Sequence, residues 1–214
     1  MQAPRLNVLA LAVLPGLAVV ILVALARAVG DVPMHYLTRD IATLAGIHPF
    51  FGVMSNLGLM LWAASAAVSL LTVLILMKSG EGVSKFFLAS GALSLWLLFD
   101  DAFLFHEELA PKHMGLETEL VLVGLGVAVA AWLAAFRREI LAAGPFFLVL
   151  SLGLFAVSLG VDFAADFFPA EETEESWRIF YEDAPKWLGI VFWLAFHVTA
   201  SVNTLTGSVK AQSR

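Results

Sequence analysis

Apolar residues lie in long stretches along this chain, and short polar segments separate them. A helix that crosses a membrane needs about 20 mainly apolar residues. Six stretches qualify, over residues 6–29, 50–77, 85–105, 116–136, 140–167 and 184–204. The pattern predicts an all-α fold: a polytopic integral membrane protein, built as a bundle of about six transmembrane helices in a single domain over residues 1–214. We interpret the first stretch as a retained span and not as a cleaved signal.

Two further segments, residues 31–49 and 169–181, are too polar to span. We expect them to lie along the membrane surface as interfacial segments. In the second segment Trp177, Phe180 and Tyr181 carry the amphipathic rings that concentrate at membrane–water interfaces.

The composition supports this class of protein. The chain is 60% hydrophobic and 14% charged, with a mean hydropathy of +0.89, whereas soluble domains carry roughly 25% charged residues. The absence of cysteine excludes disulfides and thiolate chemistry. No basic cluster indicates nucleic-acid binding. The expected partners are therefore the lipid bilayer and either a second copy of the chain or another membrane subunit.

The charges are divided unequally between the two predicted faces of the membrane. One face carries seven Lys and Arg residues and two acids, Glu81 and Glu139. The other carries five basic residues and sixteen acids. Because loops rich in Lys and Arg stay in the cytoplasm, both termini are predicted to be cytoplasmic and the acidic loops to face outward. The expected location is the plasma or inner membrane.

The densest polar segment comes at the outer end of the third predicted span. Asp100 and Asp101 lie there about 8 Å deeper in the membrane than His106, from the rise of a helix. On a regular helix Asp100 and Glu107 would share one stripe, and His106 would point elsewhere. Carboxylates at membrane depth are costly and usually have a partner or a function.

Two other predicted spans bring polar residues to the same depth. Asp162 follows Ser158 by four residues and so shares its helix face. Asp183 is expected to cap the last span, with Pro185 in its first turn. Lys186 lies one turn into that span, and we predict that it pairs with one of the acids, which lowers the cost of both charges.

We therefore predict an outward-facing polar centre that binds or relays a cation or a proton. Its main residues are Asp100, Asp101, Asp162 and Lys186. The residues expected to support it are Asn56, Ser158 and Glu182. The alternative for all of these is structural, with ion pairs and hydrogen bonds that fix helix packing. The predicted role of His197, deeper in the last span, is packing.

Three classes of function fit the pattern. The first is the cation- or proton-handling protein just described. The second is a structural or accessory subunit of a membrane complex. The third is a metal-assisted hydrolase acting on lipid at the outer leaflet, in which Asp101, His106 and Asp162 hold a divalent cation and Glu107 is the general base. The sequence identifies no catalytic residue by a motif, and a divalent cation is the one cofactor it suggests.

Overall fold

The computed structural model describes residues 6–82, 84–165 and 172–212. It is 86% helical and contains no strand in these ranges. The chain divides into two compact units, residues 1–53 and 54–214, and each unit is described here by itself.

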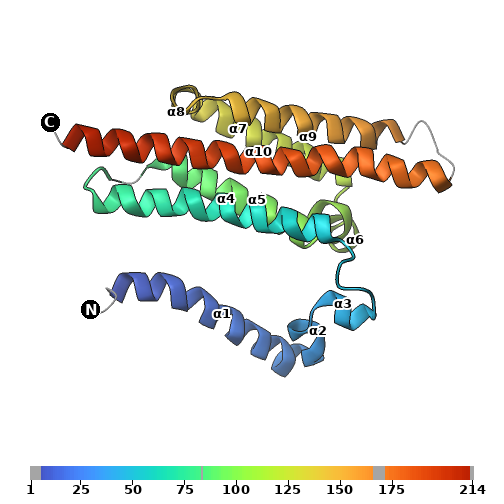
Figure 1. The fold of residues 1–214 in the computed structure, drawn as a ribbon. Helices are drawn as coiled ribbons and strands as arrows, with labels where there is room; N and C mark the ends of the chain where they lie inside the picture. Colours follow the sequence, from blue (N-terminus) through green and yellow to red (C-terminus); the bar gives the residue numbers. More distant parts are fainter. Residues whose placement is uncertain (1–5, 83, 166–171, 213–214) are drawn as a thin grey trace. The chain divides into compact units, whose positions relative to one another are not determined.

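The first unit contains a long apolar helix followed by two short ones, α1 (Leu6–Gly30), α2 (Met34–Thr38) and α3 (Ile41–Ala45) (Figure 1). Asp40 caps α3: its Oδ1 accepts a hydrogen bond of 2.8 Å from the Thr43 backbone N–H, and its Oδ2 accepts one of 2.9 Å from the Thr43 hydroxyl. Both bonds favour the carboxylate, so they hold the pKa of Asp40 below its ordinary value.

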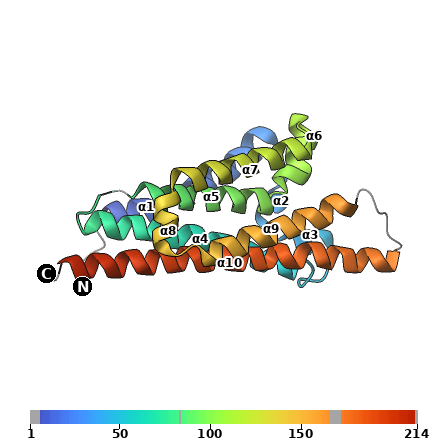
Figure 2. The ribbon, with the colours of Figure 1, turned by 90° about the horizontal axis from the view of Figure 1, so that it is seen from above.

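The second unit consists of long helices that lie alongside one another (Figure 1 and Figure 2). The short segments η1 (Phe105–Leu109), α6 (Ala110–Met114) and α8 (Arg137–Ala143) connect them. The long helices are α4 (Val53–Lys78), α5 (Lys85–Ala102), α7 (Thr118–Ala135), α9 (Phe146–Ala165) and α10 (Glu172–Gln212).

Four of these helices are long and apolar enough to cross a membrane, namely α4, α7, α9 and the part of α10 over Trp177–Gly207. A fifth span is formed if α5 and the bent segment Phe105–Met114 count as one. In α1 the stretch Gly16–Gly30 qualifies only as a shorter apolar helix. The prediction of a helical, multi-pass membrane protein is confirmed at this level, and the predicted number of six spans is not.

Two helix boundaries differ from those predicted. The stretch 140–167 is interrupted by Gly144, which adopts a positive φ of 92°, and by Pro145, which lacks a backbone N–H. A new helix, α9, therefore begins at Phe146. In contrast, α10 begins at Glu172 and continues through Pro185. Asp183 is therefore inside a helix and does not cap one.

Aromatic side chains form the centre of the second unit. Trp62, Trp132, Trp193 and Phe196 are buried, and the Trp193 ring lies 5.8 Å from Trp62 and 5.5 Å from Trp132. Each buried indole N–H in this group has a partner, as membrane interiors require. Trp132 donates to the Ser90 hydroxyl at 3.2 Å, Trp193 donates to the Ser94 hydroxyl at 3.0 Å, and Trp62 donates to Asp101.

His197 belongs to this aromatic centre. Its side chain is fully buried, and its Nδ1 lies 2.8 Å from the carbonyl oxygen of Trp193, one turn earlier in α10. The imidazole contacts the rings of Trp132, Trp193 and Phe196. These contacts agree with the predicted packing role, although Nε2 is buried and has no hydrogen-bond partner among the described residues.

Candidate functional site

The candidate site forms where α5 ends in a sharp bend. Leu104 adopts a left-handed backbone conformation, with φ 48° and ψ 47°, and the chain then enters the π-helical turn η1. The helix axis bends by 57° at this point. A left-handed conformation costs a non-glycine residue free energy, so other contacts must hold the bend in place.

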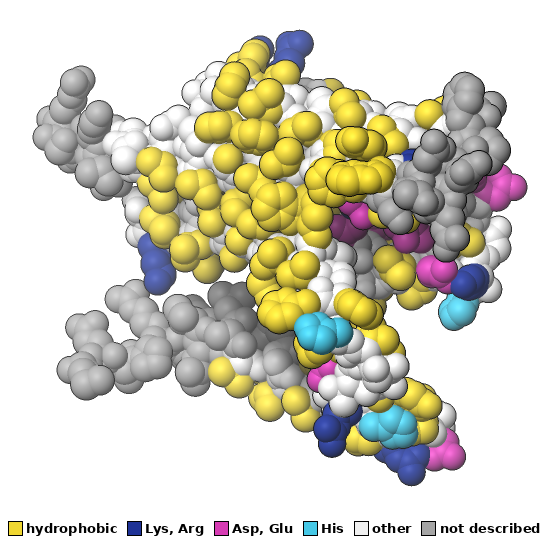
Figure 3. All heavy atoms as spheres, turned by 45° about the vertical axis from the view of Figure 1, so that its right-hand side comes forward, with side chains coloured by type: hydrophobic (Ala, Val, Ile, Leu, Met, Phe, Trp, Pro, Cys, Tyr) yellow, Lys and Arg dark blue, Asp and Glu magenta, His cyan; other side chains and the backbone are white. Residues whose placement is uncertain are grey.

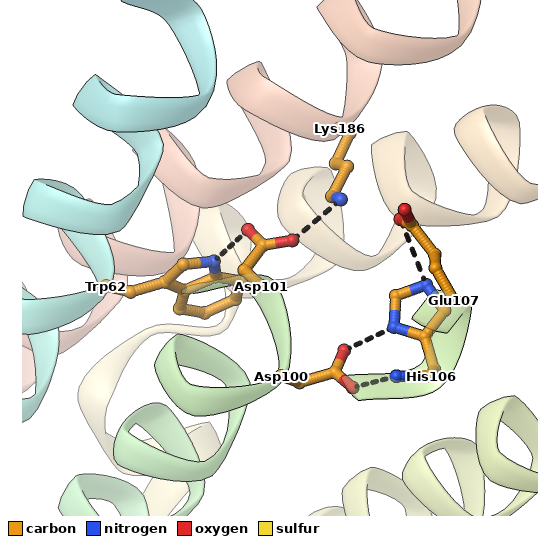
Figure 4. A network of polar contacts seen from close by, with 6 residues as sticks. All are labelled: Trp62, Asp100, Asp101, His106, Glu107 and Lys186. Carbon is orange, nitrogen blue, oxygen red and sulfur yellow. Dashed lines mark hydrogen bonds and ion pairs between the residues drawn. The ribbon is translucent and has the colours of Figure 1, made fainter. Parts of the chain in front are cut away.

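Asp100 supplies such contacts. Its Oδ1 accepts a hydrogen bond of 3.2 Å from the backbone N–H of His106, and its Oδ2 lies 2.7 Å from Nδ1 of the same histidine (Figure 4). One carboxylate therefore satisfies a backbone donor freed by the helix break and also fixes the imidazole above it. The side chain of Asp100 is only 7% exposed.

The other nitrogen of His106 faces a second carboxylate. Nε2 lies 3.4 Å from Oε1 of Glu107, whose side chain is half exposed. The imidazole itself is 14% exposed. His106 therefore bridges a buried carboxylate and one that reaches the surface of the protein.

Asp101 makes a separate set of contacts across three helices. Its Oδ1 lies 2.7 Å from Nζ of Lys186 on α10, and its Oδ2 accepts a hydrogen bond of 3.1 Å from Nε1 of Trp62 on α4 (Figure 4). Asp101 is on α5, so the three side chains join three helices. The predicted pairing of Lys186 with an acid is confirmed, and its partner is Asp101.

The structure corrects the predicted position of His106. The prediction extended a regular helix through residue 108, which would turn His106 away from the acids. The left-handed Leu104 and the π-helical turn bend the chain by 57° instead, and they bring His106 onto Asp100. The same break changes the neighbours of Glu108, which pairs with Lys112 one turn later.

Within the described residues, no hydrogen bond or ion pair joins the other predicted members to this network. Asp162 is exposed on α9, and Asn56 is exposed on α4. Ser158 is buried. Glu182 pairs with Arg178 on its own helix at 3.3 Å. Asp166, which follows Asp162 by four residues in the sequence, lies outside the described residues.

The residues proposed to hold a metal do not form a ligand set. Within the described ranges, no three His, Asp or Glu side chains converge closely enough to share a metal ion. Asp101 contacts Lys186 and Trp62 instead of a shared ligand position, and both ring nitrogens of His106 contact carboxylates, those of Asp100 and Glu107.

Trp62 is a member of the site that the sequence analysis did not identify. A tryptophan inside a spanning helix needs a hydrogen-bond partner for its indole N–H. Its position at the same depth as the acids could therefore have indicated that one of them is this partner. In Figure 3, hydrophobic side chains spread over much of the visible face of the larger unit, and a few acidic side chains are visible among them.

Apolar helices of spanning length around a recessed network of charged side chains define a multi-pass helical membrane protein. The chain belongs to the family described as "Domain of unknown function (DUF8692)", which it matches over residues 11–200. No curated protein and no solved structure matches the chain.

Proposed function

We propose that this membrane protein takes up and releases a proton on the outward side of the membrane, through Glu107, His106 and Asp100. The observation that carries the proposal is the bridging position of His106. One imidazole nitrogen faces a carboxylate near the surface, and the other contacts a buried carboxylate. Histidine suits this role because its unperturbed charge change falls near neutral pH.

The proposed transfer conserves every proton. A proton passes from the Glu107 carboxyl group to Nε2 of His106, and the proton on Nδ1 passes to Oδ2 of Asp100. The imidazole is then neutral in its other tautomer, and the negative charge has moved from Asp100 to Glu107. Return of the proton reverses both steps, so the group works as a relay between the surface and a buried acceptor.

The pair of Asp101 and Lys186 supports this role by its position. It places a fixed positive and a fixed negative charge beside the relay, at 2.7 Å from each other. Because the two charges offset each other, the pair adds little net charge to the site. We infer a proton as the ion because the carboxylates are distributed between a lysine and a histidine, and do not form the oxygen-rich cage that a divalent cation requires.

The first experiment measures proton binding directly. Purified protein in lipid nanodiscs is titrated over about pH 5–8, the range in which histidine changes charge, and bound protons are counted with an indicator dye. The His106→Gln variant is expected to bind about one proton fewer per chain than the wild type. His113→Gln is the reference for the loss of an exposed histidine, on the neighbouring helix α6. In an Asp100→Asn background the titration midpoint of His106 is expected to shift and that of His113 is not.

Two results would contradict the proposal. One is a His106→Gln variant that binds as many protons as the wild type. The other is a His106 titration midpoint that does not move in an Asp100→Asn variant, which would mean that His106 takes up its proton independently of the Asp100 contact. Nitrogen-15 chemical shifts of His106 in an Asp100→Asn variant give a second measurement that does not depend on the dye.

A second candidate function is that of a structural or accessory subunit. The contacts of Asp101 favour it, because one carboxylate joins α4, α5 and α10 through Trp62 and Lys186. In that case the charges position helices and the protein assembles with a membrane partner. Unchanged proton binding in His106→Gln, together with a large loss of stability in Asp101 variants, would favour this candidate.

A further inference from the structure

A hollow lies beside the ion pair, between the first turns of α4 and the middle of α10. Met54, Ser55 and Gly58 line it from α4, and Asp101 lines it from α5. The remaining lining residues, all on α10, are Asp183, Lys186, Trp187 and Ile190. With its open mouth, the hollow contains about 360 Å³ free of protein atoms.

Trp187, which lines this hollow, has a hydrogen-bond donor without a partner. Its Nε1 is buried and has no partner within the described part of the chain. Cδ1, the indole atom next to Nε1, lies beside Gly58, another lining residue. A Cβ added at Gly58 would lie 3.7 Å from this Cδ1. A buried donor without a partner is costly, so we expect the occupant to offer an acceptor oxygen there.

The charges of the hollow indicate an occupant that carries both signs. The Lys186 ammonium has three donors, so it can bind an oxygen of the occupant in addition to Asp101. Asp183 is exposed on the same helix, about 4.5 Å along the axis from Lys186. Because Asp101 and Lys186 offset each other, Asp183 leaves the hollow with a net negative charge, which disfavours a purely anionic occupant.

The apolar surroundings indicate that this occupant carries hydrocarbon chains. Met54 and Ile190 form walls of the hollow. Outside it Leu57 and Met60 on α4 are 45% and 65% exposed, and Leu188 on α10 is 42% exposed. In a spanning bundle such side chains face lipid, so α4 and α10 both offer apolar surface to acyl chains close to the hollow.

We propose that the hollow binds the headgroup of a zwitterionic phospholipid of the phosphatidylethanolamine class. The headgroup ammonium contacts Asp183, and the phosphate oxygens accept hydrogen bonds from Lys186 and from Nε1 of Trp187. The acyl chains lie along the exposed faces of α4 and α10. This inference does not depend on the proposed proton relay, although Asp101 and Lys186 border both.

The test compares lipids on the intact protein in detergent by native mass spectrometry. The probes are phosphatidylethanolamine, phosphatidylglycerol and water-soluble phosphoethanolamine. The wild type is expected to bind phosphatidylethanolamine most tightly. The Trp187→Phe variant, which keeps an aromatic ring and loses the N–H, is expected to weaken that binding at least about fivefold. Asp183→Asn is expected to abolish the preference over phosphatidylglycerol.

Trp177→Phe is the control, because Trp177 is exposed on the same helix and outside the hollow. It is expected to bind as the wild type does. Equal binding of the two phospholipids by the wild type, or unchanged binding in Trp187→Phe, would overturn the proposal. Displacement of the lipid by an equal concentration of phosphoethanolamine would contradict the proposal that the occupant is a lipid, and it would identify the free zwitterion as the ligand instead. Proton counting on His106→Gln is unaffected by any of these results, so the two proposals fail separately.

Discussion

At the scale of single residues, the second unit depends on polar side chains that have partners inside an apolar bundle. The hydroxyls of Ser94 and Ser90 accept hydrogen bonds from the indole N–H groups of Trp193 and Trp132. Ser201 differs, because its buried hydroxyl has no partner among the residues that the structure covers. These serines therefore offer a direct comparison of a used and an unused hydroxyl.

The Ser94→Ala variant is expected to lose about 1–3 kcal/mol of unfolding free energy, because it leaves the Trp193 N–H buried without an acceptor. Ser201→Ala removes a hydroxyl of the same size at a similarly buried position and is expected to be nearly neutral. Chemical unfolding in one detergent measures both. Equal losses would mean that the cost comes from the cavity and not from the hydrogen bond.

The ion pair gives a second prediction at this scale. Replacing Lys186 by Met leaves Asp101 without its cation and is expected to cost about 1.5–3 kcal/mol, at the lower end because the Lys186 side chain is 36% exposed. Asp101→Asn is expected to cost a similar amount. The double variant is expected to cost less than the sum, since neither charge is then left alone. Strict additivity would show that the two side chains do not interact energetically.

At the scale of helices, the sequence predicts apolar segments well and their interruptions poorly. The depth shared by Lys186 and the acids followed from counting residues along regular helices, and the contact with Asp101 is present. The neighbours of His106 could not be predicted in this way. Leu104 adopts a left-handed backbone conformation, and a leucine side chain gives no sign of that in the sequence. That break is stabilised by the hydrogen bonds of Asp100 with His106, only six residues later, and helical periodicity does not represent this local contact.

The start of α10 was mispredicted for a related reason. Pro185 and Asp183 form a typical helix start in a local window, yet α10 runs through both. It packs against α9 just beyond Pro185, where the Ser151 hydroxyl donates to the Gly189 carbonyl at 2.7 Å. Such contacts between neighbouring helices outweigh a local preference for a break.

Glycines give a prediction for helix packing. A Cβ at Gly189 of α10 would lie 2.7 Å from the Phe155 ring, whereas one at Gly126 of α7 would meet nothing within 4 Å. Gly189→Ala is expected to destabilise the protein by about 1–3 kcal/mol through overpacking. Gly126→Ala is expected to be neutral or to stabilise by up to about 1 kcal/mol, because alanine favours helix. Thermal unfolding of both variants compares them, and a stable Gly189→Ala would contradict the close approach.

At the scale of the whole molecule, α10 is far longer than a membrane is thick. Its 41 residues extend about 62 Å, against a hydrocarbon core of about 30 Å. At least two turns of this helix therefore project beyond the bilayer. Glu182 and Arg178 pair near its beginning at 3.3 Å, as expected of a helix surface that meets water.

The proposed orientation can be tested because the chain contains no cysteine. Single cysteines at His113 and Arg138 lie on α6 and α8, which flank the spanning helix α7 at its two ends. Both positions are exposed. We expect a membrane-impermeant maleimide to label His113→Cys on intact cells, and Arg138→Cys only after permeabilisation. The reverse pattern would place the polar centre on the cytoplasmic side.

The hydrogen bond between Trp62 and Asp101 has an optical consequence. The indole N–H points directly at a carboxylate oxygen at 3.1 Å, so the electric field along the excited-state dipole depends on the charge of that carboxylate. Any event that neutralises Asp101 or moves Lys186 changes the emission wavelength of this one tryptophan. The difference spectrum between the wild type and Trp62→Phe isolates its signal, so the protein carries an intrinsic reporter of the state of its own polar centre.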